Sequence, residues 1–301
     1  MADASYTAVD LSRLAASDAV EELDFETILA DAIAKMREYM AESGLTFAAR
    51  NSDPATKLLQ AFSYFAQLMR QRINEAVRAV MVASATGNDL DNVAANFGVT
   101  RLTITPADED TGTAAVMESD TDLRRRVVLA PEGYSVAGPE GAYIFHTLSA
   151  DSDVLDATAT SPSPGQVLVT VLSRTGNGAA PQAVLDTVES YLSAATRRPL
   201  TDLVTVQSAE IVEYAVDYDL TAYSGPDRDV VFATSKAQVD AYVADSHRLG
   251  RDITIAALHR AALAEGAQNV LLRSPAADIP ISRQQAPYCT GVTARFAGNG
   301  E

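Results

Sequence analysis

The sequence of 301 residues is short of the residue types that crosslink chains and hold metal ions. It contains one cysteine, Cys289, so an internal disulfide is excluded, as expected for a protein folded in a reducing cytosol. The three histidines, His146, His247 and His259, are far apart, and none has the spacing of a metal-binding motif. We therefore predict no metal site and no bound cofactor.

Positive charge is also scarce. Lysine and arginine together number 23 against 40 aspartates and glutamates, which gives a net charge of -17. Nucleic acid and anionic membranes bind broad basic surfaces, so neither is an expected partner. The N-terminus lacks the basic and apolar segments of a secretion signal, and no apolar run approaches the roughly 18 residues of a membrane span. We expect a soluble protein that is made in the cytoplasm.

The N-terminal third of the chain is expected to be an acidic arm followed by helices. Residues 1–23 are rich in acids and predict the arm. Residues 24–100 show helical spacing of apolar side chains and predict a helical region that binds a partner in a bundle. The first apolar stripe of this region is expected to contact the partner, and it consists of Phe25, Ile28, Leu29, Ile33, Met36 and Met40.

A long helix is the strongest structural signal in the sequence. Asp53 and Pro54 supply an N-cap followed by proline at the first helical position, and Gly87 supplies a stop. Apolar residues keep helical spacing up to Thr86, which predicts a helix roughly 50 Å long. Such a helix suits a bundle shared with another chain, and we add Leu68 and Arg72 to the predicted partner contact.

The middle of the chain, residues 101–165, predicts a small β domain, either a barrel or a sandwich, with an acidic outer face. Glycine and proline separate its short runs of strand-forming residues. These runs lie at 113–116, 127–129, 134–136 and 143–147. Serines and prolines at 161–165 mark the end of this domain.

The remaining residues, 166–301, predict an α+β domain for self-association. Strands are expected at 166–173, 212–222, 270–273 and 290–296, and helices at 181–195, 229–247 and 255–265. In the 212–222 strand, apolar and polar side chains alternate, which indicates one wet face. Helices packed on a sheet make the whole chain an α+β protein.

No group of residues is arranged as a catalytic site is, so we do not predict an enzyme. Asp217 and Asp219 share one face of a strand and could bind a cation, but a solvated strand face is the favoured interpretation. The arginines at 124–126 either grip a partner's carboxylates or offset the acids near them. Cys289 has no second cysteine, and a buried or half-buried structural thiol is expected.

An enzymatic alternative also remains open. A cytosolic, cation-dependent hydrolase would place Asp108, Glu109 or Asp110 beside a bound cation in the β domain. Such an enzyme would be a compact monomer that the cation stabilises against heat.

Several colinear segments carry a family resemblance. They include residues 51–59 (NSDPATKLL), 68–76 (LMRQRINEA), 85–91 (ATGNDLD), 138–146 (GPEGAYIFH), 198–209 (RPLTDLVTVQSA) and 247–252 (HRLGRD). Together they span about residues 20 to 301 in order. The chain thereby resembles the phage tail baseplate assembly protein J family.

The resemblance implies a structural protein of a contractile phage tail or tailocin, located in the tail baseplate of the particle and assembled in the cytoplasm of the host bacterium. Members of the family are similar to wedge proteins that form a ring around the central spike. The implied partners are a second copy of the chain within each wedge, a second wedge protein, and the sheath-initiating and spike or hub proteins. The implied role couples the ring to sheath contraction, and no catalytic residue is carried over.

Overall fold

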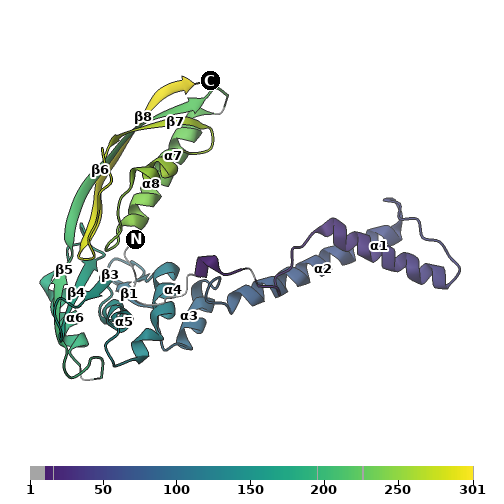
Figure 1. The fold of residues 1–301 in the computed structure, drawn as a ribbon. Coiled ribbons are helices and arrows are strands. Elements are labelled where there is room, and N and C mark those ends of the chain that lie inside the picture. Colours follow the sequence, from purple (N-terminus) through teal and green to yellow (C-terminus); the bar gives the residue numbers. More distant parts are fainter. Residues whose placement is uncertain (1–10, 16, 195, 226, 301) are drawn as a thin grey trace. The chain divides into compact units, whose positions relative to one another are not determined.

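The computed structural model describes residues 11–15, 17–194, 196–225 and 227–300. These residues divide into two compact units. The first unit, which we call the hairpin unit after its two longest helices, consists of the described residues from 11 to 100 together with 119–127. The sheet unit holds residues 101–118 together with the described residues from 128 to 300. The elements form an α+β protein, as predicted (Figure 1).

Helices make up the hairpin unit. Asp24 caps the first of them by accepting a hydrogen bond from the Thr27 N–H, and Asp53 caps the second by accepting one from the Ala55 N–H. Pro54 occupies the first helical position, as the sequence predicts. The elements are η1 (Leu11–Arg13), α1 (Phe25–Glu42), α2 (Pro54–Ala79), α3 (Gly87–Ala95) and most of α4 (Asp120–Leu129).

The long helix exists but is shorter than the sequence predicts. α2 has 26 residues and so measures about 39 Å at 1.5 Å per residue. It ends at Ala79 because the following residues turn back onto its last carbonyls. The Ser84 hydroxyl donates to the Arg78 carbonyl at 2.8 Å, and this bond ends the helix before the predicted Thr86.

The middle region is not a β-barrel or a sandwich, which corrects the prediction. The runs at 127–129 and 143–147 are helical, and residues 141–148 of α5 are buried at every position except Phe145. A helix that is buried on nearly all sides shows no 3.6-residue pattern, so its sequence resembles a buried strand. The elements of the region are β1 (Thr103–Thr105), β2 (Val116–Met117), η2 (Glu132–Tyr134), α5 (Glu140–Ala150) and β3 (Val154–Thr160).

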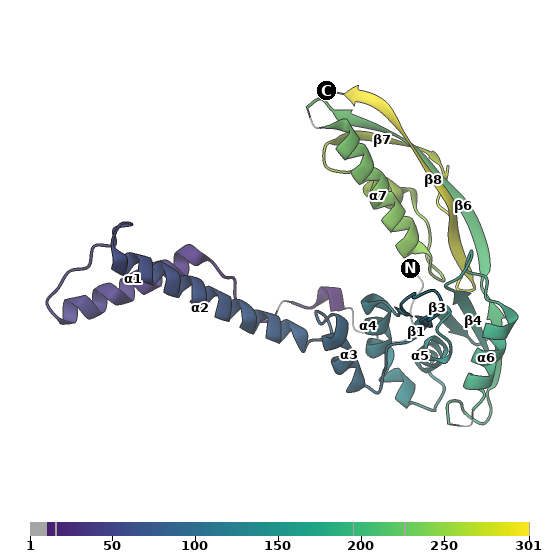
Figure 2. The same ribbon diagram turned by 180° about the vertical axis from the view of Figure 1, so that it is seen from behind.

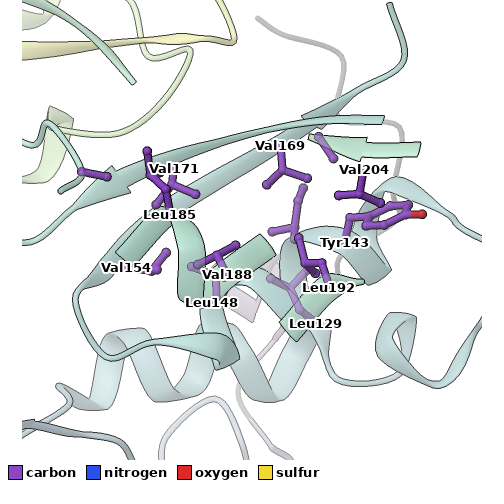
Figure 3. Close-up of a cluster of buried hydrophobic side chains, with 13 residues drawn as sticks. Leu129, Tyr143, Leu148, Val154, Val169, Val171, Leu185, Val188, Leu192 and Val204 are labelled. Carbon is purple, nitrogen blue, oxygen red and sulfur yellow. The ribbon is translucent and has the colours of Figure 1, made fainter. Parts of the chain in front are cut away.

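The three-stranded sheet β3-β4-β5 organises this part of the sheet unit. β4 (Gln166–Ser173) pairs antiparallel with β3 and parallel with β5 (Leu203–Ser208), and α6 (Gln182–Leu192) connects the parallel pair. Figure 3 shows the core between the sheet and the helices, with Val169 and Val171 on the sheet side and Val188 on the helix side. Residues 161–165, predicted as a domain boundary, form the turn between β3 and β4 and so join two strands of one sheet.

A second sheet, in the order β7-β6-β8, forms the C-terminal part of the sheet unit. Both ribbon views show its helices on the same face of the sheet (Figures 1 and 2). Val216, Tyr218 and Leu220 point into the core beneath them. The predicted elements are present as β6 (Glu210–Tyr223), α7 (Arg228–Ser246), α8 (Ile255–Ala262), β7 (Ala267–Ser274) and β8 (Gln285–Gly300).

The two sheets of this unit are joined through buried polar contacts. Asp156 of β3 is 4% exposed, and its Oδ2 accepts a hydrogen bond from the Leu249 N–H at 3.0 Å. The Thr158 hydroxyl donates to the Arg283 carbonyl at 2.7 Å, and Arg283 also forms an ion pair with Glu140. The segments around Leu249 and Arg283 therefore hold the C-terminal part against β3.

Candidate interaction surface on the helical hairpin

The hairpin of α1 and α2 presents an unusual distribution of polarity. α1 lies along α2 in both ribbon views (Figures 1 and 2). Thr56, Ser63 and Asn74 of α2 are buried, with exposures of 2%, 0% and 3%. Their spacings of 7 and 11 residues place them on one face of the helix. α2 therefore turns small polar side chains inward.

The opposite face of α2 is apolar and exposed. Leu58, Phe62, Phe65, Met69 and Ile73, which we call the outer α2 stripe, follow one another at spacings of three or four residues. Their exposed fractions are 71%, 64%, 62%, 70% and 58%. A contiguous apolar surface of this kind marks an interaction site.

The predicted contact residues divide between the two helices. Leu29 of α1 is buried, and the other members of the α1 stripe are half-buried along α2. The hairpin thus already covers much of Phe25, Ile28, Leu29, Ile33, Met36 and Met40. Leu68 of α2 is 47% exposed, and Arg72 extends into solvent, where its guanidinium contacts Glu75 at 3.3 Å.

From the sequence, the outer α2 stripe is predicted only as part of an amphipathic helix and lies outside the predicted contact. A signal for it exists in the sequence. Thr56, Ser63 and Asn74 share one helical face, and their small polar side chains differ from the bulky apolar face opposite. Small polar side chains allow a neighbouring helix to pack closely on one face of a long helix. The bulky apolar face then stays exposed and can bind another partner.

The segment before α1 packs on the hairpin. Residues 1–10 and 16 of the predicted acidic arm lie outside the described residues. Residues Ser17 to Leu23 run back to α2, where Glu21 is bound by Asn74 and lies 3.7 Å from Arg70. A cavity of about 460 Å³ lies where this segment meets the end of α2, between Leu14, Val20 and Met81. The end of the predicted arm is therefore held against the hairpin.

Two arginines of the run at 124–126 bind backbone carbonyls, a role that the sequence does not predict. Arg124 donates to the carbonyls of Val82 and Ala85 at 2.8 and 2.6 Å. Arg126 is buried and donates to the Thr100 carbonyl at 3.1 Å. These bonds satisfy carbonyl groups in the turns that follow α2 and α3.

Three of the carboxylates singled out in the sequence, Asp108, Asp217 and Asp219, have local partners. Asp217 and Asp219 pair with arginines of the neighbouring strands. The Thr111 hydroxyl, followed by the backbone N–H groups of Asp110 and Thr111, donates hydrogen bonds to Asp108 and holds the pKa of Asp108 below its usual range. Within the described residues, no three histidine, cysteine or acidic side chains are grouped to hold a metal ion.

The other titratable residues of interest are placed in helices or at a strand edge. His146 lies on α5 and is buried, which corrects its predicted place on a strand. His247 caps the end of α7, as expected. Cys289 is half-buried, as predicted, and burial raises the pKa of its thiol. Among the described helices, none is both long and apolar enough to cross a membrane.

Comparison with known proteins finds matches along most of the chain. A family model described as the Baseplate J-like N-terminal domain matches residues 51–108, and one described as the Baseplate J-like central domain matches residues 135–208. Baseplate protein J of Escherichia phage P2 is 47% identical over 299 residues, which cover 97% of this chain and 99% of that protein. The first family model spans α2 and α3, and the second spans the β3-β4-β5 sheet.

A weaker likeness is found among solved structures. The cryo-EM structure of the anti-feeding prophage baseplate contains a chain that matches with 14% identity and a TM-score of 0.38. The match covers 58% of this chain and 43% of that chain, less than half of its length. A likeness at this level supports no conclusion about fold or partners.

Proposed function

The chain belongs to the baseplate J-like family of phage tail baseplate structural proteins, and from this premise we propose that it is a wedge component of a contractile tail or tailocin. It has no catalytic role in this proposal. It self-associates within the wedge and binds a second wedge protein. The wedges form a ring around the central spike and, with the spike and sheath-initiating proteins, couple that ring to sheath contraction.

The observation that carries the proposal is the outer α2 stripe. Burying a large apolar side chain stabilises a complex by about 1.5–3 kcal/mol, so five such residues supply roughly 7–15 kcal/mol before costs. Association costs about 4–15 kcal/mol in lost freedom of motion. The stripe alone therefore supports a weak contact, and a tight one needs additional surface beside it.

The margin of the stripe offers that surface. Leu68 is exposed next to the stripe, and Arg72 extends beside it. A helix of the second wedge protein that fills the stripe would contact both residues. The half-buried α1 stripe then completes the bundle from the other side of α2, so the predicted α1 residues contribute mainly to the shape of the hairpin.

The test is the mass of the complex that this chain forms when it is co-expressed with its candidate second wedge protein. We expect Met69→Glu to abolish or strongly weaken a complex that forms with the unchanged chain, as measured by light scattering on a sizing column. Tyr39→Glu is the matched control, since Tyr39 is a 56% exposed apolar residue on α1 outside the stripe. A complex of normal mass with Met69→Glu would contradict the proposed contact.

A further inference from the structure

β5 is an edge strand of the β3-β4-β5 sheet. Within the described residues it pairs with β4 alone, in parallel and without a break in register. The Leu203 N–H donates to the Gly165 carbonyl at 2.8 Å, and the Ala209 N–H donates to the Val171 carbonyl at 2.8 Å. Because backbone groups alternate in direction along a strand, the odd-numbered residues of β5 face β4.

The even-numbered residues of β5 turn their backbone groups to the outer side of the sheet. The side chain of Val204 lies in the core shown in Figure 3, and that of Val206 packs against it. In the part of the chain that the structure describes, no hydrogen bond reaches the N–H and C=O groups of these two valines. We call these groups the open β5 edge. They repeat every two residues, about 6.6 Å apart, and an extended backbone is the ligand that matches such a row.

β5 also lacks the features by which proteins prevent strand edges from pairing. Two carbonyls of β3 accept hydrogen bonds from Arg248 and Arg283. The edge strands of the other sheet, β7 and β8, carry Arg273 and Arg295, and both have breaks in their register with β6. β5 reads LVTVQS, without charge, proline or a break in register. A regular, uncharged edge is a template for another strand.

The surroundings of the open β5 edge indicate which segment fits it. Leu203 at the start of β5 is 62% exposed, and Leu200 just before it is 94% exposed. An apolar side chain on an added strand would cover them, since neighbouring strands pair their side chains. Glu210, just beyond the other end of β5, is also exposed and favours a basic residue there. The expected segment is therefore extended, apolar beside Leu203 and basic near Glu210.

We propose that the open β5 edge binds an extended segment of a different baseplate protein as a fourth strand of the β3-β4-β5 sheet. A second copy of this chain is the less suitable occupant, because it brings the same net charge of -17 and no excess of basic residues. The proposal rests on the location of the chain in the tail baseplate and is independent of the contact at the outer α2 stripe.

The two contacts would act together in the assembled particle. One added strand of about six residues makes few hydrogen bonds, so the open β5 edge alone binds weakly. Once another contact such as the outer α2 stripe holds the proteins together, the segment is present at a high effective concentration. We therefore expect the added strand in the assembled particle and not in the isolated chain.

The experiment compares amide hydrogen exchange of the full chain alone with that of the chain in purified tail particles. Mass spectrometry with fragmentation that resolves single amides measures both. In the isolated chain, the Val206 N–H is expected to exchange at least about tenfold faster than the Thr205 N–H, which faces β4. In the particle, exchange at Val206 is expected to slow at least about tenfold, while exchange at Thr205 stays unchanged.

Three results would overturn the proposal. Exchange at Val206 that is as fast in the particle as in the isolated chain would show that no strand is added. Slow exchange in the isolated chain at high dilution would mean that its own residues bond to the edge. Slowing that appears as the isolated chain is concentrated would assign the edge to a second copy.

A proline variant tests whether assembly needs the added strand. Val206→Pro removes the outward N–H and leaves the bonds between β5 and β4 in place. We expect it to preserve the melting curve of the isolated chain and to lower the yield of intact particles at least about tenfold. Gln182→Pro is the matched control, since proline at the first position of α6 breaks no helical hydrogen bond.

The yields of the two variants are read together. A normal particle yield with Val206→Pro, or an equal loss with Gln182→Pro, would contradict a role for the open β5 edge. If Val206→Pro lowers the melting temperature of the isolated chain, the exchange measurement on the unchanged chain decides. Loss of the complex in Met69→Glu tests the outer α2 stripe separately, so the two proposals can fail independently.

Discussion

Asn74, on the buried side of α2, holds both polar groups of the Glu21 backbone. Its Oδ1 accepts a hydrogen bond from the Glu21 N–H at 3.0 Å, and its Nδ2 donates to the Glu21 carbonyl at 2.8 Å. The two residues are 53 positions apart in the chain. Through this pair, the segment that precedes α1 is fastened to the inner face of α2, and the apolar outer stripe stays free.

The first prediction concerns Asn74 itself. Asn74→Ala leaves two backbone groups of Glu21 without their partner, and we expect the hairpin to lose about 1–3 kcal/mol. Urea unfolding followed by circular dichroism measures the change. Gln71→Ala is the control, since Gln71 is exposed and only contacts Glu75 at 3.3 Å. Equal effects of the two substitutions would mean that Asn74 has no special role.

Ser63 should be a site where a substitution stabilises the protein. Its side chain is 0% exposed, and no described atom is a hydrogen-bond partner of its hydroxyl. Replacing a buried, unpaired hydroxyl removes a desolvation cost, so Ser63→Ala is expected to raise the free energy of unfolding by about 1 kcal/mol. Ser84→Ala should lower it, because Ser84 donates to Arg78. Thermal unfolding of both variants tests whether Ser63→Ala raises the stability and Ser84→Ala lowers it.

The joint between the two sheets depends on Asp156. Its Oδ1 accepts from the Ala157 N–H at 2.8 Å, and its Oδ2 accepts from the Leu249 N–H. Asp156→Ala leaves both donors unpaired in a buried place, and we expect a loss of about 2–4 kcal/mol. Calorimetry should also show the single transition of the sheet unit broaden or split. Asp186→Ala, at an exposed position on α6 that contacts Gln182, should do neither.

Stability should fall in mild acid because of His146. Burial, together with the charge of Arg197, lowers the pKa of His146 below its ordinary value of 6.5. At a pH between the lowered pKa of the folded state and 6.5, the unfolded chain binds a proton that the folded chain does not. The contribution of neutral His146 to the free energy of unfolding is therefore fully present above pH 6.5 and is lost as the pH falls through the folded-state pKa. His146→Gln should remove this part of the slope in urea unfolding against pH.

Cys289 should react slowly with thiol reagents in the folded protein. Burial raises the pKa of its thiol, so less thiolate, the reactive form, is present at pH 8 than in an unfolded chain. We expect labelling by a chromogenic disulfide to be at least tenfold slower in buffer than in strong denaturant. A folded chain that reacts as fast as the denatured one would contradict the half-buried placement of Cys289.

Some elements are predictable because neighbouring residues specify them. Asp53 and Pro54 start α2 wherever the helix packs, since the cap bonds the first N–H groups and the proline has no N–H to lose. The apolar and polar alternation along β6 identifies a strand with one covered face, because side chains alternate along a strand. The family resemblance likewise depends on the order of residues alone.

Other elements depend on contacts between distant segments. α5 resembles a strand in sequence because it is buried from nearly all sides, and those sides belong to the β3-β4-β5 sheet and α6. Arg124 binds the carbonyls of Val82 and Ala85, about 40 residues away in the chain, and its neighbours in sequence do not indicate this contact. Neither environment can be inferred from adjacent residues.

The same distinction applies to the interaction surface. The sequence alone determined the start of α2, the amphipathic helices, most of the C-terminal strands and the membership of the baseplate J-like family. Only the tertiary structure decided that α1 covers the polar face of α2 and leaves Phe62, Phe65 and Met69 in solvent. The reason is that helical spacing shows which residues share a face, whereas the face that is buried depends on where the rest of the chain packs.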